Sequence, residues 1–144
     1  MSNTNELFAV SVHILTLLAA YPDSPLTSDA IATSVDTHPV VIRRTMSHLR
    51  RHGLVESRPG TNGGWRLMKP AESISLCEVY HAVSHDNVLS MHSHPNLICR
   101  VGGNIQVPLQ KVFGQAQNAM EAELDRFTVS DILQDVISYA GQTL

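Results

Sequence analysis

Residues 39–70 are rich in arginine, a side chain well suited to binding a polyanion. Seven of the ten basic residues of the chain lie there, together with a single acid, Glu56. An arginine guanidinium can bind a phosphate or, through two parallel N–H groups, the O6 and N7 atoms of guanine. The stretch therefore predicts a nucleic-acid-binding surface. Its basic residues are Arg43, Arg44, Arg50, Arg51, Arg58, Arg66 and Lys69.

The rest of the chain is acidic, so the net charge of −3 hides this segregation. Residues 1–38 contain four acids and no lysine or arginine, and residues 71–144 contain eight acids and three bases. An ordinary solvent-exposed helix would mix both signs of charge, so the absence of acids around these arginines favours a DNA-binding role.

A second group of potentially reactive residues lies in the polar segment 84–103. Cys99 precedes Arg100, whose positive charge favours a thiolate, so a thiol switch is one interpretation. Packing of Cys99 at the seam of a dimer is the alternative. Cys77, between Leu76 and Glu78, is expected to be a buried structural residue.

The same segment contains His85, His92 and His94, which could bind zinc or nickel, but a His-x-His pair has no sure third ligand. We therefore expect no metal site. An iron–sulfur cluster is not expected either, because clusters are held mainly by several thiolates and this loop contains one cysteine. No group orients a base or an oxyanion site near Cys99, so we expect no enzymatic activity.

Length and composition predict one globular domain with a helical extension. The chain has 144 residues, of which 43% are hydrophobic and 16% are charged. Its first residues lack the basic region of an export signal, and the longest apolar stretch, residues 7–21, is interrupted by polar residues. Two cysteines are too few for a disulfide framework. We expect a soluble cytoplasmic protein.

Three helices are predicted before and within the basic stretch: residues 5–21, 27–34 and 39–52. Thr27 or Ser28 can cap the second helix, and Thr37 can cap the third, which begins at Pro39. Gly53 follows as a left-handed C-terminal residue. The spacing of Ile42, Met46 and Leu49 predicts the core face of the third helix, which leaves its arginines exposed. A short helix, a turn and a basic helix form a helix-turn-helix.

Two extended runs, residues 54–57 and 65–67, follow at once and flank a glycine-rich loop, which predicts a winged helix-turn-helix. The glycines would let the tip of the wing approach another backbone closely. Arg43 and Arg44 are expected to read bases, and Arg50 and Arg51 to bind phosphates or dock the helix beginning at residue 76. Trp65 could contact DNA or pack beneath the wing. The full set of candidate DNA contacts is Ser28, Thr37, Val40, Val41, Arg43, Arg44, Ser47, Arg50, Arg51, Arg58, Gly60, Thr61, Asn62, Gly64 and Trp65.

Helices are also predicted for residues 76–83, 104–126 and, as a short final helix, 127–133. Ser73 or Ser75 would cap the first of these, and Thr128 or Ser130 the last. The long helix has an apolar stripe that lies outside the DNA-binding unit, and a second copy of the chain is its expected partner. The expected division is a DNA-binding domain (1–83), a sensor loop (84–103) and a dimerisation region (104–144).

Several motifs make the chain resemble the Rrf2 family of bacterial winged-helix regulators, over essentially its whole length and most of all the YwnA-type members. These motifs are the Leu-Arg-Arg-His-Gly-Leu-Val run of residues 49–55, the glycines of residues 60–64 with Leu67, the Ile-Ser-Leu of residues 74–76, the Pro-Val-Val-Ile-Arg-Arg run that starts at Pro39, and the loop around Cys99. The resemblance implies a mainly α-helical fold with a β-hairpin wing and a homodimer with crossed long helices. It also implies binding of double-stranded DNA at a palindromic operator, usually as a repressor. A metal- or redox-sensing protein that does not use its winged fold for operator binding is the alternative.

Overall fold

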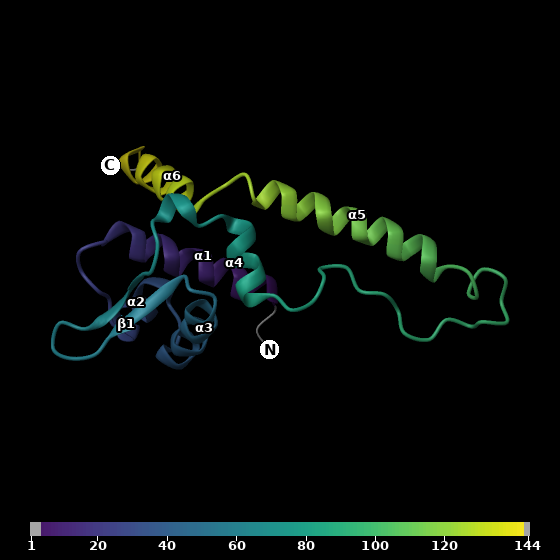
Figure 1. Cartoon of the computed structure of the whole chain (residues 1–144), viewed down its shortest axis with the longest axis horizontal. Coiled ribbons are helices and arrows are strands. Elements are labelled where there is room, and N and C mark those ends of the chain that lie inside the picture. Colours follow the sequence, from purple (N-terminus) through teal and green to yellow (C-terminus); the bar gives the residue numbers. More distant parts are fainter. Residues whose placement is uncertain (1–3, 143–144) are drawn as a thin grey trace.

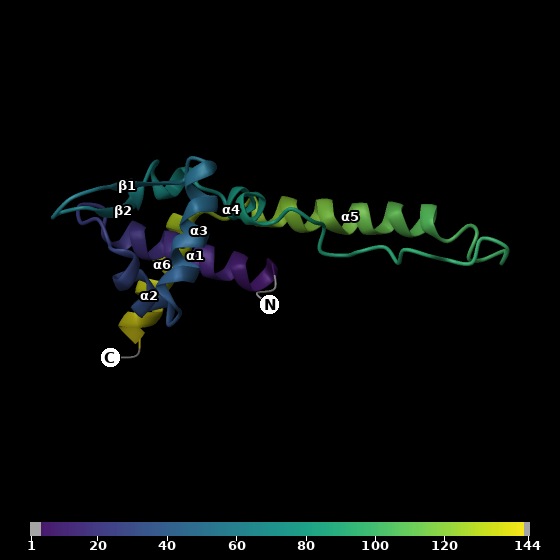
Figure 2. The ribbon, with the colours of Figure 1, turned by 90° about the horizontal axis from the view of Figure 1, so that it is seen from below.

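The computed structural model describes residues 4–142 and, within them, consists of helices with a two-stranded antiparallel hairpin. A cluster of short elements, here called the head, surrounds α1, and residues 84–124, here called the arm, extend away from it (Figures 1 and 2). Among the described residues, no helix is both long and apolar enough to cross a membrane. The elements are, in chain order, α1 (Thr4–Ala20), α2 (Ser28–Val35), α3 (Pro39–Arg51), β1 (Val55–Arg58), β2 (Gly64–Leu67), the 3-10 helix η1 (Ala71–Ser73), α4 (Leu76–Val83), α5 (Gln106–Leu124) and α6 (Val129–Gln142).

Helix α1 forms the centre of the head and packs against α2, α4, α6 and β2. Ile14 and Leu18 are almost completely buried on it. Ser11 and Thr16 are also buried, and their hydroxyls donate to backbone carbonyls four residues earlier, at 2.8 and 2.7 Å. Because both hydroxyls form hydrogen bonds within the helix, α1 can be buried by neighbouring elements on several sides without leaving an unpaired polar group.

Helices α2 and α3 form the predicted helix-turn-helix. Thr27, one of the two candidate caps, accepts a hydrogen bond from the backbone N–H of Ala30 and begins α2. The prediction that Thr37 caps α3 was wrong. The backbone N–H of Thr37 donates to the carbonyl of Ala32 and so completes the end of α2, while His38 precedes α3 without a side-chain cap.

The predicted core face of α3 is confirmed, since Ile42, Met46 and Leu49 are completely buried. The helix ends one residue earlier than expected, at Arg51. Gly53 has a φ of 71°, the left-handed conformation predicted for it. These three apolar side chains fix the rotation of α3 about its axis, which leaves the arginines facing solvent.

The wing is confirmed, but each strand also includes one residue that was expected in the loop: Arg58 in β1 and Gly64 in β2. Val55 pairs with Leu67 and Arg58 pairs with Gly64, whereas the expected strands covered residues 54–57 and 65–67. A backbone bridge between Leu26 and Trp65 adds the segment before α2 to the edge of β2. The wing is therefore tied to the helix-turn-helix as well as to itself.

Helix α4 has its predicted bounds, and Ser75 accepts a hydrogen bond from the N–H of Glu78 as its cap. Helix α6 is longer than the short helix expected over residues 127–133. Thr128 and Asp131 exchange hydrogen bonds between side chain and backbone N–H at its start, which is a capping box with aspartate. Val129 is completely buried, and α6 packs against α1.

The arm consists of residues 84–105, which run outward, and α5, which returns to the head (Figure 1). Helix α5 is two residues shorter at each end than the predicted range 104–126. Gln117 joins it to the rest of the molecule, because its side chain donates to the Tyr80 hydroxyl and accepts from the Val88 N–H. The predicted division into DNA-binding, sensor and dimerisation regions stays a prediction; within the protomer, α6 belongs to the same core as α1.

Candidate nucleic-acid interface

The exposed side of α3 presents a continuous polar face with two valines at its start. Arg44, Ser47 and Arg51 lie on one side of the helix, because residues three, four and seven apart share a face. Both of these arginines are exposed. Val40 and Val41 are 53% and 37% exposed, although valine usually lies in a core. The face therefore offers guanidinium donors, a hydroxyl and methyl groups, the groups that read base edges.

Two of the seven basic residues of the stretch are already paired with acids. Arg66 forms a salt bridge with Glu56 across the wing, and Lys69 forms one with Glu78 on α4. Within the described residues, no acid pairs with the others, which are Arg43, Arg44, Arg50, Arg51 and Arg58. The unpaired charges thus coincide with the five arginines predicted to contact DNA.

The tip of the wing exposes Arg58, Thr61 and Asn62. The hairpin closes through a hydrogen bond from Gly63 N–H to Gly60 carbonyl, at 3.0 Å, and Gly60 has a φ of 103°. Small residues are required here by the turn itself. The tip is an acid-free loop that projects away from the helices, on the side of the head opposite to the arm (Figure 2).

The close backbone approach expected of the wing glycines occurs inside the protein at Gly64. A Cβ atom there would lie 2.7 Å from the Leu26 carbonyl oxygen. Trp65, the next residue, is half-buried and donates from Nε1 to Ser28 Oγ at 3.2 Å. Gly64, Trp65 and Ser28 therefore lie together at the root of the wing, whereas Thr61 and Asn62 lie at its tip.

The edge of α3 that carries Arg44, His48 and Arg51 faces the beginning of the arm. The rings of His48 and His85 lie 6.1 Å apart between centroids. His52 Nδ1–H donates to the His48 carbonyl at 2.9 Å. Burial lowers the pKa of His48, and the neighbouring charges of Arg51 and His85 lower it further. The positive charge of this edge at neutral pH therefore comes from arginine rather than from His48.

Cys99 is exposed near the outer end of the arm, as expected for an accessible thiol. The backbone N–H groups of Gly102 and Val101 lower its pKa by hydrogen bonding to the sulfur. A Cβ atom on Gly102 would lie 2.4 Å from the Asn96 carbonyl oxygen, so only glycine fits this turn. Cys77 differs: it is half-buried on α4, and burial together with the charge of Glu121 raises its pKa.

Two histidines of residues 84–103 have contacts that do not involve Cys99. His85 lies against His48, whereas the His92 carbonyl accepts a hydrogen bond from Gln106 at the start of α5. Within residues 4–142, no group of three or more histidine, cysteine, aspartate or glutamate side chains is arranged to hold a metal ion.

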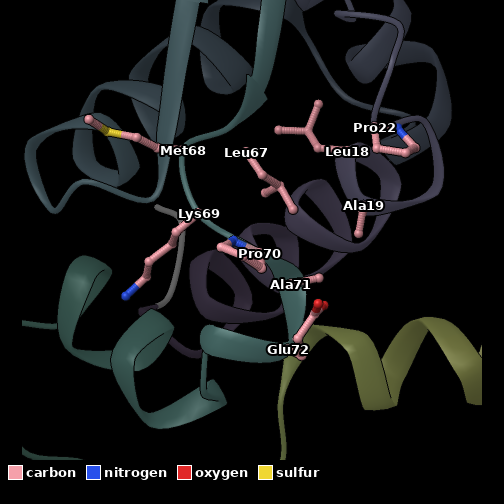
Figure 3. Close-up of a pocket in the computed structure, with 9 residues that line it drawn as sticks. All are labelled: Leu18, Ala19, Pro22, Leu67, Met68, Lys69, Pro70, Ala71 and Glu72. Carbon is pink, nitrogen blue, oxygen red and sulfur yellow. The ribbon is translucent and has the colours of Figure 1, made fainter.

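A hollow of about 520 Å³ at the base of the wing had no clear signal in the sequence. It lies between the end of α1 and the segment that joins β2 to η1 (Figure 3). Lys69 points away from it toward α4, where it pairs with Glu78. Pro22 and Pro70 lie in its wall, and in a sequence such prolines indicate only where a helix or strand ends. Its lining residues are Leu18, Ala19, Pro22, Leu67, Met68, Lys69, Pro70, Ala71 and Glu72.

Comparison with known proteins decides the family. Residues 4–135 match the family described as Rrf2, iron-dependent transcriptional regulator. The chain belongs to the Rrf2 family. The match covers the head and the arm together, so the winged helix-turn-helix and the long helix α5 are both part of the Rrf2 architecture in this chain.

Individual Rrf2 relatives agree with this assignment. YwnA of Bacillus subtilis (strain 168), whose name classes it with HTH-type transcriptional regulators, is 40% identical over 130 residues, which cover 90% of this chain and 96% of YwnA. A crystal structure of a protein classed as DNA-binding is 38% identical, covers 88% of this chain and 98% of its own, and superimposes with a TM-score of 0.73. T. potens IscR has the same fold, with a TM-score of 0.70 at 20% identity over 94% of this chain and 87% of its own. The winged-helix fold predicted from the sequence is confirmed.

The iron named in the Rrf2 description does not fit the ligands of this chain. Cluster ligation takes mainly thiolates. The arm offers one cysteine, Cys99, while Cys77 lies half-buried on α4 with a raised pKa that disfavours the thiolate.

Proposed function

We propose that this Rrf2 protein is a repressor that binds a palindromic DNA operator as a homodimer in the cytoplasm. The observation that carries the proposal is the set of five arginines on α3 and the wing that have no acidic partner among the described residues. Helix α3 enters the major groove, and Arg43 and Arg44 near its beginning read bases. Arg50, Arg51 and Arg58 contact phosphates, which fix the position of α3 in the groove.

A second copy of the chain covers α5 in this proposal. Helix α5 has no buried residue within the protomer, although Leu109, Phe113 and Met120 recur along it at helical spacing. Val112, three residues after Leu109 on the same side, is 57% exposed. Pairing of two such helices buries the stripe and holds two heads at a fixed distance, as a palindrome requires.

Cys99 gives the proposed regulator a site for thiol modulation. Its exposure and the hydrogen bonds of Val101 and Gly102 N–H favour a reactive thiolate. The thiolate attacks one oxygen of hydrogen peroxide, the O–O bond breaks, and a sulfenic acid and hydroxide form. Oxidation at the outer end of the arm then changes the relative setting of the two heads.

Selection of bound sequences from a random pool of duplex DNA at physiological salt tests the DNA-binding proposal. Wild-type protein should enrich one palindromic motif, and the double variant Arg43→Ala, Arg44→Ala should lose the enrichment while its circular dichroism spectrum stays that of wild type. Substituting Arg100 and Lys111 on the arm by alanine removes the same charge and should leave the enrichment intact. No enrichment by the wild-type protein would overturn the proposal.

A further inference from the structure

Trp65 lies where the wing, α2 and α3 meet, and its side chain contacts residues on both helices. The indole Nε1–H donates to Ser28 Oγ at 3.2 Å. The guanidinium carbon of Arg50 lies 6.0 Å from the centroid of the indole ring. The rigid side chain of Trp65 therefore contacts Ser28 of α2 through its N–H and Arg50 of α3 through the face of its ring.

The backbone fixes this indole in place. The Leu26 N–H donates to the Trp65 carbonyl at 3.0 Å, and the Trp65 N–H donates to the Leu26 carbonyl at 2.7 Å. Gly64 allows this pairing, because its φ is +146° and a Cβ atom there would lie 2.7 Å from the Leu26 carbonyl oxygen. Trp65 is thus anchored to the segment that leads into α2.

Arg50 and Ser28 present free donors beside this indole. A guanidinium that lies over an aromatic ring is held without using its N–H groups, and no acid pairs with Arg50 in the part of the chain that the structure describes. Ser28 uses its oxygen as an acceptor for Trp65, which leaves its hydroxyl hydrogen to donate. Asp29, beside Ser28, is exposed and forms no described salt bridge with Arg50.

We propose that Arg50 and Ser28 together bind one phosphate of the DNA backbone, and that Trp65 is a positioning residue that holds both donors. Arginine and a hydroxyl are donors that phosphate oxygens accept, and they carry no base information. Because the pair bridges α2, α3 and the wing, one bound phosphate sets the positions of all three elements. This inference rests on the proposed function and specifies how the same surface grips one strand.

The first test measures the salt dependence of binding to the duplex selected from the random pool. Each phosphate contact contributes about 0.9 to the slope of log affinity against log salt concentration. Arg50→Ala should reduce the magnitude of the slope by about 0.9 per protomer and should leave the selected sequence unchanged. Ethylation of a single phosphate in each half-site should weaken wild-type binding and have no effect on the Ser28→Ala, Arg50→Ala variant, which lacks both proposed donors.

The second test separates positioning from direct contact by a double-mutant cycle. Trp65→Leu should weaken binding of the wild-type protein, but should add less than about twofold in the Ser28→Ala, Arg50→Ala background. In the matched control background, Arg58→Ala, the effect of Trp65→Leu should add in full, because Arg58 lies in the wing without a described contact to the indole. Trp65→Phe keeps a ring beneath Arg50 and should restore part of the loss, and it replaces Trp65→Leu if thermal melting shows that the leucine variant is unfolded.

Three outcomes would overturn the inference. These are an unchanged salt slope in Arg50→Ala, ethylation effects at every half-site phosphate that persist in the Ser28→Ala, Arg50→Ala variant, or full additivity of Trp65→Leu with that double variant. Each leaves the proposed function standing, because wild-type enrichment of one motif is measured independently. Failure of wild-type enrichment would instead remove the function itself.

Discussion

The two cysteines have opposite surroundings, which separates their reactivity. Cys99 is exposed, and the N–H groups of Gly102 and Val101 lower its pKa. Cys77 is half-buried, and burial and the charge of Glu121 raise its pKa. Since the thiolate is the nucleophile, Cys99 has the larger reactive fraction at neutral pH and Cys77 the smaller.

Iodoacetamide should therefore alkylate Cys99 roughly tenfold faster or more than Cys77 at pH 7. Mass spectrometry of digested protein after timed exposure measures both rates. Peroxide should weaken operator binding of the wild type and of Cys77→Ser, but not of Cys99→Ser. An equal response of the wild type and Cys99→Ser would remove the thiol from the proposed regulation, and equal alkylation rates would show that the local surroundings do not control reactivity.

At the residue scale, the sequence predicted correctly which side chains of α3 are buried and which are exposed, because this follows from helical spacing. Ile42 and Met46 were assigned to the core and the arginines to the surface, and both assignments are confirmed. Thr37 was assigned wrongly, because its backbone N–H completes α2 and the tight turn leaves no cap for α3. The contact of Trp65 with Ser28, 37 residues away, depends on how the wing folds back, which local spacing does not determine.

At the scale of the element, α6 contributes to the head through Val129, whose side chain is completely buried. Its first turn is fixed by the exchange of hydrogen bonds between Thr128 and Asp131. The Leu76 N–H also donates to the Phe127 carbonyl, and the Val129 N–H to the Ile74 carbonyl. The start of α6 is therefore pinned to the start of α4.

Val129→Ala should lower the free energy of unfolding of the head by roughly 1–3 kcal/mol, because it removes buried methyl groups and leaves a cavity. Val40→Ala is the matched control: its side chain is 53% exposed, and the change should be within about 0.5 kcal/mol. Urea unfolding followed by circular dichroism measures both. Equal effects of the two substitutions would mean that α6 does not complete the core.

Elements with strong local signals were predicted closely. Pro39 and Gly53 bracket α3, and Ser75 precedes α4, so their bounds could be read from the sequence. The exception is α6, which was predicted too short although Val136 and Ile137 continue the helical spacing of Ile132 and Leu133. What local spacing does not determine is that α6 packs against α1, which is more than a hundred residues away in the chain.

At the scale of the whole molecule, the arm extends α5 away from the head (Figure 2), and Val112, beside the apolar stripe of α5, is 57% exposed. Val112→Glu should place a charge in the proposed dimer seam, and sedimentation velocity at micromolar concentration should show a shift from dimer to monomer. Asn118→Glu adds the same charge on the opposite side of α5 and should leave the dimer intact. A wild-type protein that sediments as a monomer would contradict the proposed dimer.

The return of α6 to the head has a consequence for synthesis on the ribosome. The chain is made from its N-terminus, and domains generally fold as units as they emerge. Val129 is one of the last buried residues to be made, after both α3 and α5. The unpaired stripe of α5 therefore emerges while the core of the head is still open beside α1, so a nascent chain is most exposed to aggregation in the interval before α6 is released.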